Sequence, residues 1–324
     1  MKILIIRLSS LGDIVLTQPI CTILSKHFPG CELSYVCKPE YHELVQLFDT
    51  PVRVMDYYKS LGFYARLRRE NYDLVIDLHG KLASWLISFA AKAKRKVCYN
   101  KQRGLRQKIV HGDKQATIES TVSLYASALR KLDITESWEY PVFRTPIKPE
   151  GERNSEKKRI AIFPGATHFT KCYPGESWIK VINSMPQHYF TLFGGKADLA
   201  LNKAINSQTK GNCSDQTAKH GFAELLQELS SHSLILSGDT GPMHLAATLG
   251  KPQIAIFGGT HPRLGFNPLN PQARIICLDL PCQPCSLHGR KQCPLGHFKC
   301  MNDISSDYIV KQIDMALQLN NNLK

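Results

Sequence analysis

Short apolar runs alternate with longer amphipathic segments along most of this 324-residue chain. Runs such as Lys2–Leu8 and Asp73–Leu78 are apolar almost throughout, which predicts buried strands, whereas Thr117–Leu132 repeats apolar residues at helical spacing. Buried strands that alternate with helices are typical of a parallel sheet covered on both faces. The pattern therefore predicts an α/β protein.

The alternation stops once and then restarts. The stretch from Pro141 to Arg159 holds three prolines, several charges and few apolar residues, which is a linker composition. We therefore predict two Rossmann-like domains with parallel sheets facing across a cleft, at residues 1–150 and 151–305. A last helix within 306–324 could pack back on the first domain. The predicted strands are Lys2–Leu8, Glu32–Cys37, Asp73–Leu78, Arg159–Phe163, Tyr189–Phe193, Ser233–Leu236 and Gln253–Phe257, and the predicted helices are Asp13–Phe28, Leu82–Lys92, Thr117–Leu132, Glu176–Met185, Phe222–Ser231, Met243–Leu249 and Ser306–Leu319.

Composition points to a cytoplasmic protein. No segment reaches the roughly 18 apolar residues that a membrane span needs. The first apolar run, Ile3–Ile6, is too short for a secretory signal. Seven of the eleven cysteines lie scattered in apolar or strand-like contexts, where reduced cysteine behaves as a small hydrophobic residue.

The formal net charge is +14, which indicates an anionic partner or surface. Part of the excess is local, because residues 92–114 hold nine Lys or Arg against one acid, Asp113. This stretch is either a solvated face or an anion-binding mouth. A nucleic-acid-binding role is disfavoured, since no nucleic-acid-binding motif is present.

Three strand-to-helix turns carry candidate chemistry, because ligands of open parallel sheets bind beyond the carboxyl ends of the strands. In the first turn, Ser9–Asp13, Asp13 is either a helix cap or a general base that takes a proton from an acceptor hydroxyl. In the second, Pro164–Lys171, small residues let the backbone approach a ligand, and Lys171 can reach a diphosphate.

The third turn is the most specific. Asp239 and Thr240 offer capping oxygens, Gly241 frees the backbone, and Pro242 fits the first position of a helix. The N-terminus of such a helix favours an anion such as a pyrophosphate. His244 follows in an otherwise apolar segment, either facing the same site or as a hydrogen-bonded core histidine.

Taken in order, these motifs resemble glycosyltransferase family 9, the ADP-heptose:lipopolysaccharide heptosyltransferases. The resemblance continues through Lys251–Pro262 and covers nearly the whole chain. It implies a GT-B fold and an inverting transfer, with no cofactor required, of heptose from ADP-heptose to a hydroxyl of the lipopolysaccharide inner core.

The resemblance also assigns roles. Asp13 matches the catalytic base, and Lys171 matches the lysine on the donor diphosphate. On the acceptor side it implies a segment containing His79 and Lys81, and the basic stretch with Arg103 and Arg106 suits an anionic, lipid-linked saccharide at the inner-membrane face. The matching donor-binding positions are Ala166, Thr167, Asp239, Thr240, Gly241 and His244.

Four further cysteines, Cys282, Cys285, Cys293 and Cys300, gather within the loop 281–300. Such spacing in a reduced protein favours a structural metal, Zn²⁺ first and iron second. Free thiols or a disulfide are the alternatives. Relatives without these cysteines exist, so the cluster is not required for transfer.

Two other functions stay open. The first is a GT-B transferase that uses another nucleotide sugar, or a protein acceptor. The second is a non-catalytic nucleotide-sugar-binding protein, which the presence of both Asp13 and Lys171 disfavours. The acceptor and the oligomeric state are not determined by the sequence.

Overall fold

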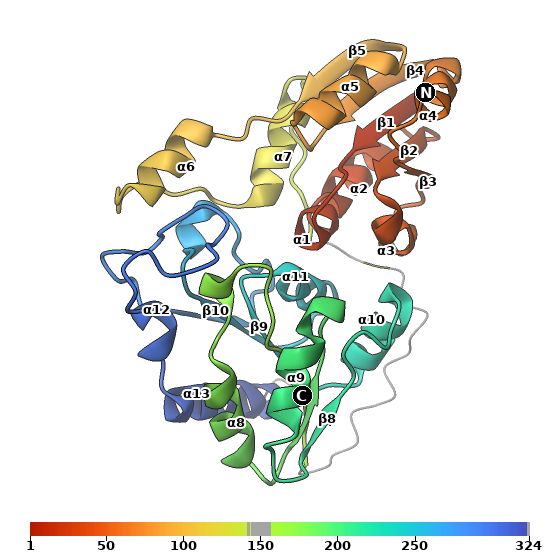
Figure 1. Cartoon of the computed structure of the whole chain (residues 1–324). Helices are drawn as coiled ribbons and strands as arrows, with labels where there is room; N and C mark the ends of the chain where they lie inside the picture. Colours follow the sequence, from red (N-terminus) through yellow and green to blue (C-terminus); the bar gives the residue numbers. More distant parts are fainter. Residues whose placement is uncertain (141–142, 144–156, 323–324) are drawn as a thin grey trace. The chain divides into compact units, whose positions relative to one another are not determined.

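A computed structural model of the chain describes residues 1–140, 143 and 157–322 (Figure 1). The chain divides into two compact units. The first combines Met1–Arg103 with Glu119–Arg144, and the second combines Gly104–Ile118 with Thr145–Lys324. Most of the predicted linker at 141–159 lies outside the described residues.

The first unit contains a five-stranded parallel sheet in the order β3-β2-β1-β4-β5. Its strands are β1 (Lys2–Ile6), β2 (Glu32–Cys37), β3 (Arg53–Asp56), β4 (Tyr72–Asp77) and β5 (Ala93–Cys98). Its helices are α1 (Leu11–Val15), α2 (Gln18–His27), α3 (His42–Gln46), α4 (Leu61–Glu70), α5 (Leu82–Ala90) and α7 (Thr121–Arg130), with a 3₁₀ turn η1 at Pro39–Tyr41.

Helices cover both faces of this sheet. Leu4 and Ile6 of β1 point into a buried cluster with Leu67 of α4 and Ile87 of α5. Alternate side chains of a strand point to the opposite face, where the hydroxyl of Tyr35 on β2 lies 2.7 Å from that of Thr17, the residue that precedes α2. Central strands that are buried on both sides explain why the sequence shows continuous apolar runs there.

The second unit contains a six-stranded parallel sheet in the order β11-β10-β9-β6-β7-β8. Its strands are β6 (Arg159–Phe163), β7 (Tyr189–Leu192), β8 (Cys213–Asp215), β9 (Leu234–Gly238), β10 (Gln253–Phe257) and β11 (Ala273–Cys277). Its helices are α6 (Arg103–Val110), α8 (Gly175–Asn183), α9 (Leu199–Asn206), α10 (Phe222–Ser230), α11 (Gly241–Thr248), α12 (Lys299–Asn302) and α13 (Ser306–Asn322), with 3₁₀ turns η2 (Phe169–Lys171), η3 (Lys196–Asp198) and η4 (Pro262–Leu264).

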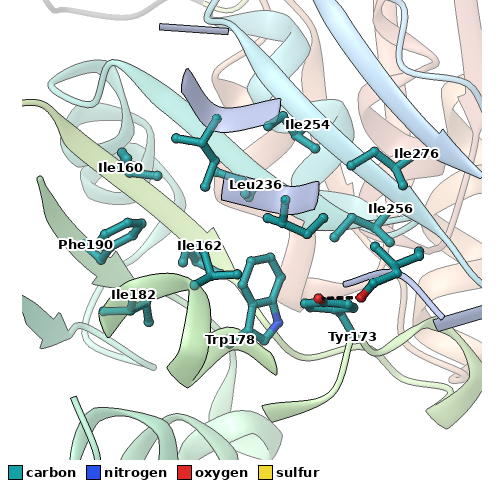
Figure 2. Close-up of a cluster of buried hydrophobic side chains, with 14 of the residues drawn as sticks. Ile160, Ile162, Tyr173, Trp178, Ile182, Phe190, Leu236, Ile254, Ile256 and Ile276 are labelled. Carbon is teal, nitrogen blue, oxygen red and sulfur yellow. Dashed lines mark hydrogen bonds between the residues drawn. The ribbon is translucent and has the colours of Figure 1, made fainter. Parts of the chain in front are cut away.

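The larger core of the second unit lies between its sheet and the helices α8 and α13. Figure 2 shows Trp178 of α8 in one cluster with isoleucines of β6 and β10. The hydroxyl of Tyr173 donates to the carbonyl of Ile304 at 2.8 Å. Ile309 and Ile313 place α13 in the same cluster, so this helix packs on the sheet of the second unit. A smaller cluster with Leu229 and Ala246 lies on the opposite face, under α10 and α11.

The predicted helix Asp13–Phe28 is two helices, α1 and α2. Pro19 lies in the first turn of α2, where its missing N–H leaves no hydrogen bond unmade. The helix therefore has to restart just before this proline. No helix of the described part of the chain is long and apolar enough to cross a membrane.

Candidate active site

Both sheets have one point where the strand order reverses, and Asp13, Lys171 and Asp239 lie in turns at these points. In the first unit the reversal falls between β1 and β4, and in the second between β6 and β9. The turns after these four strands are Ser9–Asp13, Leu78–Lys81, Pro164–Lys171 and Asp239–Gly241. Loops that leave neighbouring strands in opposite directions open a crevice at such a point, which is where ligands of open α/β sheets bind.

Asp13 is the third residue of α1, while Ser10 is the residue that caps the helix. The hydroxyl of Ser10 donates to Oδ2 of Asp13 at 2.9 Å, and the hydroxyl of Tyr125 donates to its Oδ1 at 3.1 Å. The guanidinium of Arg7 lies 2.5 Å from Oδ2. The carboxylate is thus held from three sides, which exceeds what a helix cap requires.

The electrostatics of this pair favour both charged forms. Burial of Asp13 opposes ionisation, but Arg7, with the hydrogen bonds from Ser10 and Tyr125, outweighs it and holds the pKa of the carboxyl well below its usual range. Burial likewise opposes the charge on Arg7, and Asp13 reverses that effect and raises the pKa of the guanidinium. Asp13 is therefore a carboxylate at every physiological pH.

The turn after β4 lies beside this ion pair. Arg7 also donates to the carbonyl of Leu78 at 2.6 Å, and Asp77 holds the turn by accepting from the backbone N–H groups of His79 and Gly80, each at 2.8 Å. Burial, and then the positive charges of Arg7, Lys81 and Lys101, lower the pKa of His79 to about 3. His79 is therefore neutral, and its Nδ1 has no hydrogen-bond partner within the described part of the chain.

The second unit brings Lys171 and Asp239 together. The ammonium of Lys171 lies 2.8 Å from Oδ2 of Asp239 and also donates to the backbone carbonyl of Asp239 at 2.8 Å. The hydroxyl of Thr260, after β10, donates to the same carboxylate at 2.7 Å. Lys171 is mostly buried and Asp239 is 3% exposed, so the pair is a fixed part of the turn.

Glycines allow these turns to approach one another. A Cβ added to Gly238 would lie 2.6 Å from the carbonyl oxygen of Lys171, and one added to Gly258 would lie 2.3 Å from that of Thr170. The backbone N–H of Gly259 donates to the same carbonyl of Thr170 at 2.7 Å. The loop 164–171 therefore lies directly on the ends of β9 and β10.

The other predicted donor residues surround this pair. Thr240 precedes α11, and Gly241 is the first residue of this helix. The hydroxyl of Thr240 accepts no capping hydrogen bond from a backbone N–H of the helix and donates instead to the carbonyl of Gly238 at 3.4 Å. Ala166 and Thr167 lie in the loop after β6, with Thr167 exposed. His244 lies inside α11 and is buried, which agrees with a core histidine.

The predicted acceptor-side residues belong to both units. Lys81 precedes α5 and is exposed, and Arg103 lines a cavity of about 710 Å³ beside the same helix. Arg106 belongs to the second unit, where its guanidinium is buried over the ring of Phe266 at 4.9 Å from the centroid. The basic stretch 92–114 is therefore divided between the two units, with β5 in the first and nearly all of α6 in the second.

The metal predicted at Cys282, Cys285, Cys293 and Cys300 is not supported. All four are free thiols, and no group of three or more histidine, cysteine or acidic residues in the described part of the chain could hold a metal ion. Cys300 lies in the hydrophobic core, where burial raises the pKa of its thiol to about 12, and Sγ of Cys285 donates to the carbonyl of Gly259 at 3.4 Å. These side chains act as small hydrophobic and hydrogen-bonding groups of the loop.

Sequence reasoning missed three residues that hold the candidate groups, namely Arg7, Tyr125 and Thr260. Arg7 had a signal, because a charged residue follows directly on a buried strand at the edge where ligands bind. Tyr125 lies 112 residues from Asp13, and Thr260 lies 21 residues from Asp239, so only the fold brings these pairs together.

Two parallel α/β units, each with its polar groups at the point where the strand order reverses, define the chain as a GT-B type of glycosyltransferase. The chain belongs to glycosyltransferase family 9 (heptosyltransferase), whose model matches residues 61–298. This confirms the resemblance, the fold class and the enzymatic activity that the sequence predicts.

Relatives agree over the full length. The chain is 28% identical to lipooligosaccharide heptosyltransferase 2 of Campylobacter jejuni, with 98% of this chain and 99% of that one covered. The structure of E. coli ADP-heptose lipopolysaccharide heptosyltransferase II is similar with a TM-score of 0.78 at 19% identity, over 99% of this chain and all of that one. E. coli heptosyltransferase WaaC with ADP gives a TM-score of 0.71 at 18% identity, over 98% of this chain and 100% of that one.

Proposed function

We propose that this enzyme transfers heptose from ADP-heptose, with inversion at the anomeric carbon, to a hydroxyl of the lipopolysaccharide inner core in the cytoplasm. The observation that carries the proposal is the buried Lys171–Asp239 pair at the strand reversal of the second unit. A similar fold, that of WaaC, has been solved with ADP.

The donor belongs to the second unit in this proposal. The diphosphate of ADP accepts from the ammonium of Lys171 and from the backbone N–H groups at the start of α11, where the helix dipole favours an anion. Ala166 and Thr167 contact the phosphates from the loop after β6. Asp239 orients Lys171 while Thr260 holds Asp239 in place.

The acceptor belongs to the first unit. Asp13 accepts the proton of the attacking hydroxyl as the oxygen–carbon bond forms and the bond to ADP breaks, and the leaving diphosphate stays on Lys171. Arg7 shares Oδ2 of Asp13, so the incoming hydroxyl has to compete with it for that oxygen. His79, Lys81 and Arg103 of the first unit are acceptor-side residues of the proposal, together with Arg106 of the second unit, which packs on Phe266.

A panel of nucleotide sugars tests the donor. ADP-heptose should raise the melting temperature as RT ln(1 + [L]/Kd) requires, while UDP- and GDP-sugars should not. Lys171→Ala should weaken ADP-heptose binding by about 10- to 100-fold, because a charge-assisted hydrogen bond contributes about 1.5–3 kcal/mol. Lys180→Ala, an exposed lysine of α8, is the matched control and should bind like the wild type.

Turnover tests the rest of the proposal. NMR of the product should show the inverted anomeric configuration. Stabilisation by a UDP- or GDP-sugar would show that the donor is that nucleotide sugar and not ADP-heptose. Transfer to a polypeptide would show that the acceptor is a protein. Tight ADP-heptose binding without transfer to any acceptor would show that the protein is a non-catalytic binder.

A further inference from the structure

Helix α5 exposes an apolar stripe that the transfer reaction does not explain. Leu82, Trp85, Leu86 and Phe89 are 74, 58, 37 and 71% exposed. Their spacing of three, four and seven residues places them on one face of the helix. Single exposed apolar residues are common, but a contiguous group of this size marks an interaction surface. We call these four residues the α5 face.

The stripe is separate from the core of the unit. Ser84 and Ile87 form the buried side of α5, and Ile87 packs in the cluster under the sheet. On the exposed side the rings of Trp85 and Phe89 stack with centroids 5.6 Å apart. Exposed aromatic rings ordered against each other give a flat apolar surface on the outside of the helix.

Basic side chains surround the α5 face. Residues 78–112 contain no aspartate or glutamate. Lys81, Lys96 and Arg103 line a cavity of about 710 Å³ together with Leu82, Trp85 and Phe89 of the α5 face. The one carboxylate among the residues that line this cavity, Asp77, already accepts from Ser84 and from two backbone N–H groups. The combined surface is therefore apolar at its centre and positive at its rim.

We propose that the α5 face docks on the surface of a bilayer that contains anionic phospholipids. The four apolar side chains enter the boundary between headgroups and acyl chains, where Trp and Phe partition well, and the basic rim contacts lipid phosphates. Nine residues are too few to span the hydrocarbon, so α5 lies in the plane of the surface. A protein partner would need carboxylates to match the rim, whereas an anionic bilayer supplies both the charge and the apolar phase.

Docking here would serve the transfer, and in this respect the inference rests on the proposed function. Lys81 connects α5 directly to the turn Leu78–Gly80. The carbonyl of Leu78 is held by Arg7, the partner of Asp13. A lipid-linked acceptor that projects from the bilayer at α5 therefore meets the side of the unit that carries the proposed base.

Vesicle co-sedimentation of the full chain tests the proposal. The wild type should bind vesicles of phosphatidylcholine with phosphatidylglycerol, should not bind vesicles of phosphatidylcholine alone, and should lose binding as salt rises. The double variant W85S/F89S should bind roughly tenfold more weakly or worse, because it removes most of the inserted aromatic area. K96E should weaken the dependence on phosphatidylglycerol, because Lys96 belongs to the basic rim.

Leu199→Ser is the matched control. Leu199 is 47% exposed at the start of α9 in the second unit, so its removal changes surface apolarity without touching α5. It should bind vesicles like the wild type. Thermal unfolding should show that W85S/F89S is folded, since both side chains are exposed and outside the core.

Three outcomes would overturn the proposal. The first is failure of the wild type to bind anionic vesicles at low salt. The second is binding of W85S/F89S to these vesicles as tightly as the wild type. The third is a change of oligomeric state in W85S/F89S with vesicle binding intact, which would show that the α5 face is a contact between copies of the chain. The donor assay needs no vesicle and the vesicle assay needs no donor. Failure of the transfer proposal is therefore recognised independently.

Discussion

At the residue scale, the ion pair of Arg7 and Asp13 determines what the proposed base can do. Arg7 is buried and Asp13 is partly buried, and the carboxylate of Asp13 also accepts hydrogen bonds from Ser10 and Tyr125. A carboxylate stabilised in this way is a weak proton acceptor at rest. Its basicity rises when the acceptor hydroxyl takes part of the Arg7 contact, so proton transfer belongs late in the reaction, when the hydroxyl oxygen has begun to bond to the sugar.

Asp13→Asn should lower kcat by about 10²- to 10⁴-fold, the usual contribution of a general base. The amide keeps the size of the side chain but cannot take the proton. Affinity for ADP-heptose, measured by thermal shift, should be unchanged because the donor is proposed to lie on the second unit. Asp307→Asn, an exposed acid in the first turn of α13, should leave kcat unchanged.

The pH profile sharpens this test. Because the pKa of Asp13 is held below its usual value of 3.8, the carboxylate stays ionised as pH falls to that value. The kcat/KM of the wild type should therefore show no acid limb from Asp13 between about pH 5 and 8. An activity that fell to zero with a midpoint near pH 6 and kept this midpoint in Asp13→Asn would assign the base to another group.

At the element scale, the sequence predicts the central strands and misses the edges. The unpredicted strands β3, β5, β8 and β11 are the four edge strands of the two sheets. An edge strand has one neighbour and carries polar residues that discourage further pairing, so it lacks a continuous apolar run. β5 is the clearest case, since Lys94, Arg95 and Lys96 make it read as part of a charged loop.

The candidate site follows the same division. Asp13, Lys171 and Asp239 were predicted because each lies in a turn directly after a central strand, so local sequence contains the signal. Their partners Tyr125 and Thr260 come from elements that only tertiary packing brings near. The role expected for Arg106 depended on where α6 packs, which a charge pattern does not contain.

The junction of the loop 164–171 with β9 gives a prediction at this scale. Gly238→Ala would place its Cβ 2.6 Å from the backbone oxygen of Lys171, and neither backbone can move without displacing the lysine. We expect a destabilisation of about 1–3 kcal/mol, as for other overpacked sites, and weaker ADP-heptose binding. Chemical denaturation and the donor thermal shift measure the two effects.

Gly62→Ala provides the control for this variant. Gly62 lies in α4, and a Cβ there meets nothing within 4 Å. It should be neutral or stabilising by up to about 1 kcal/mol, since alanine is the better helix former. If both substitutions changed the thermal shift produced by ADP-heptose equally, the close approach of Gly238 to the carbonyl of Lys171 would have no role in donor binding.

At the scale of the whole molecule, the two units repeat one plan with different chemistry. In each unit the order of the parallel strands reverses at one point, and polar side chains lie in the turns at that point. The first unit places an ionised carboxylate there, and the second places a lysine beside the start of a helix. The proposed reaction takes a proton from one substrate and stabilises the departure of a diphosphate from another. It therefore needs a negatively charged proton acceptor and a positively charged diphosphate site, and placing these on separate sheets keeps the two charges from neutralising each other.

The most strongly shifted buried histidine of each unit, His79 in the first and His232 in the second, gives a prediction for acid stability. Burial is the main cause that lowers the pKa of His79 to about 3 and that of His232 to about 4, from a usual value of 6.5. At a pH between the lowered pKa of each histidine and 6.5, that histidine binds a proton in the unfolded chain but not in the folded chain. The free energy of unfolding should therefore fall as pH drops below 6.5, by up to about 1.4 kcal/mol per pH unit for each histidine.

Differential scanning calorimetry between pH 5 and 7 checks this expectation. His79→Gln should flatten the pH dependence of the transition of the first unit, and His232→Gln that of the second, while the exposed His111→Gln should change neither. The contribution of Asp13 has the opposite sign and lies lower. Its depressed pKa adds stability that is fully present above its usual value of 3.8 and is lost only below it, so it does not overlap the histidine window. A melting temperature of the wild type that stayed constant from pH 7 to 5 would mean that both histidines take up their protons in the folded state.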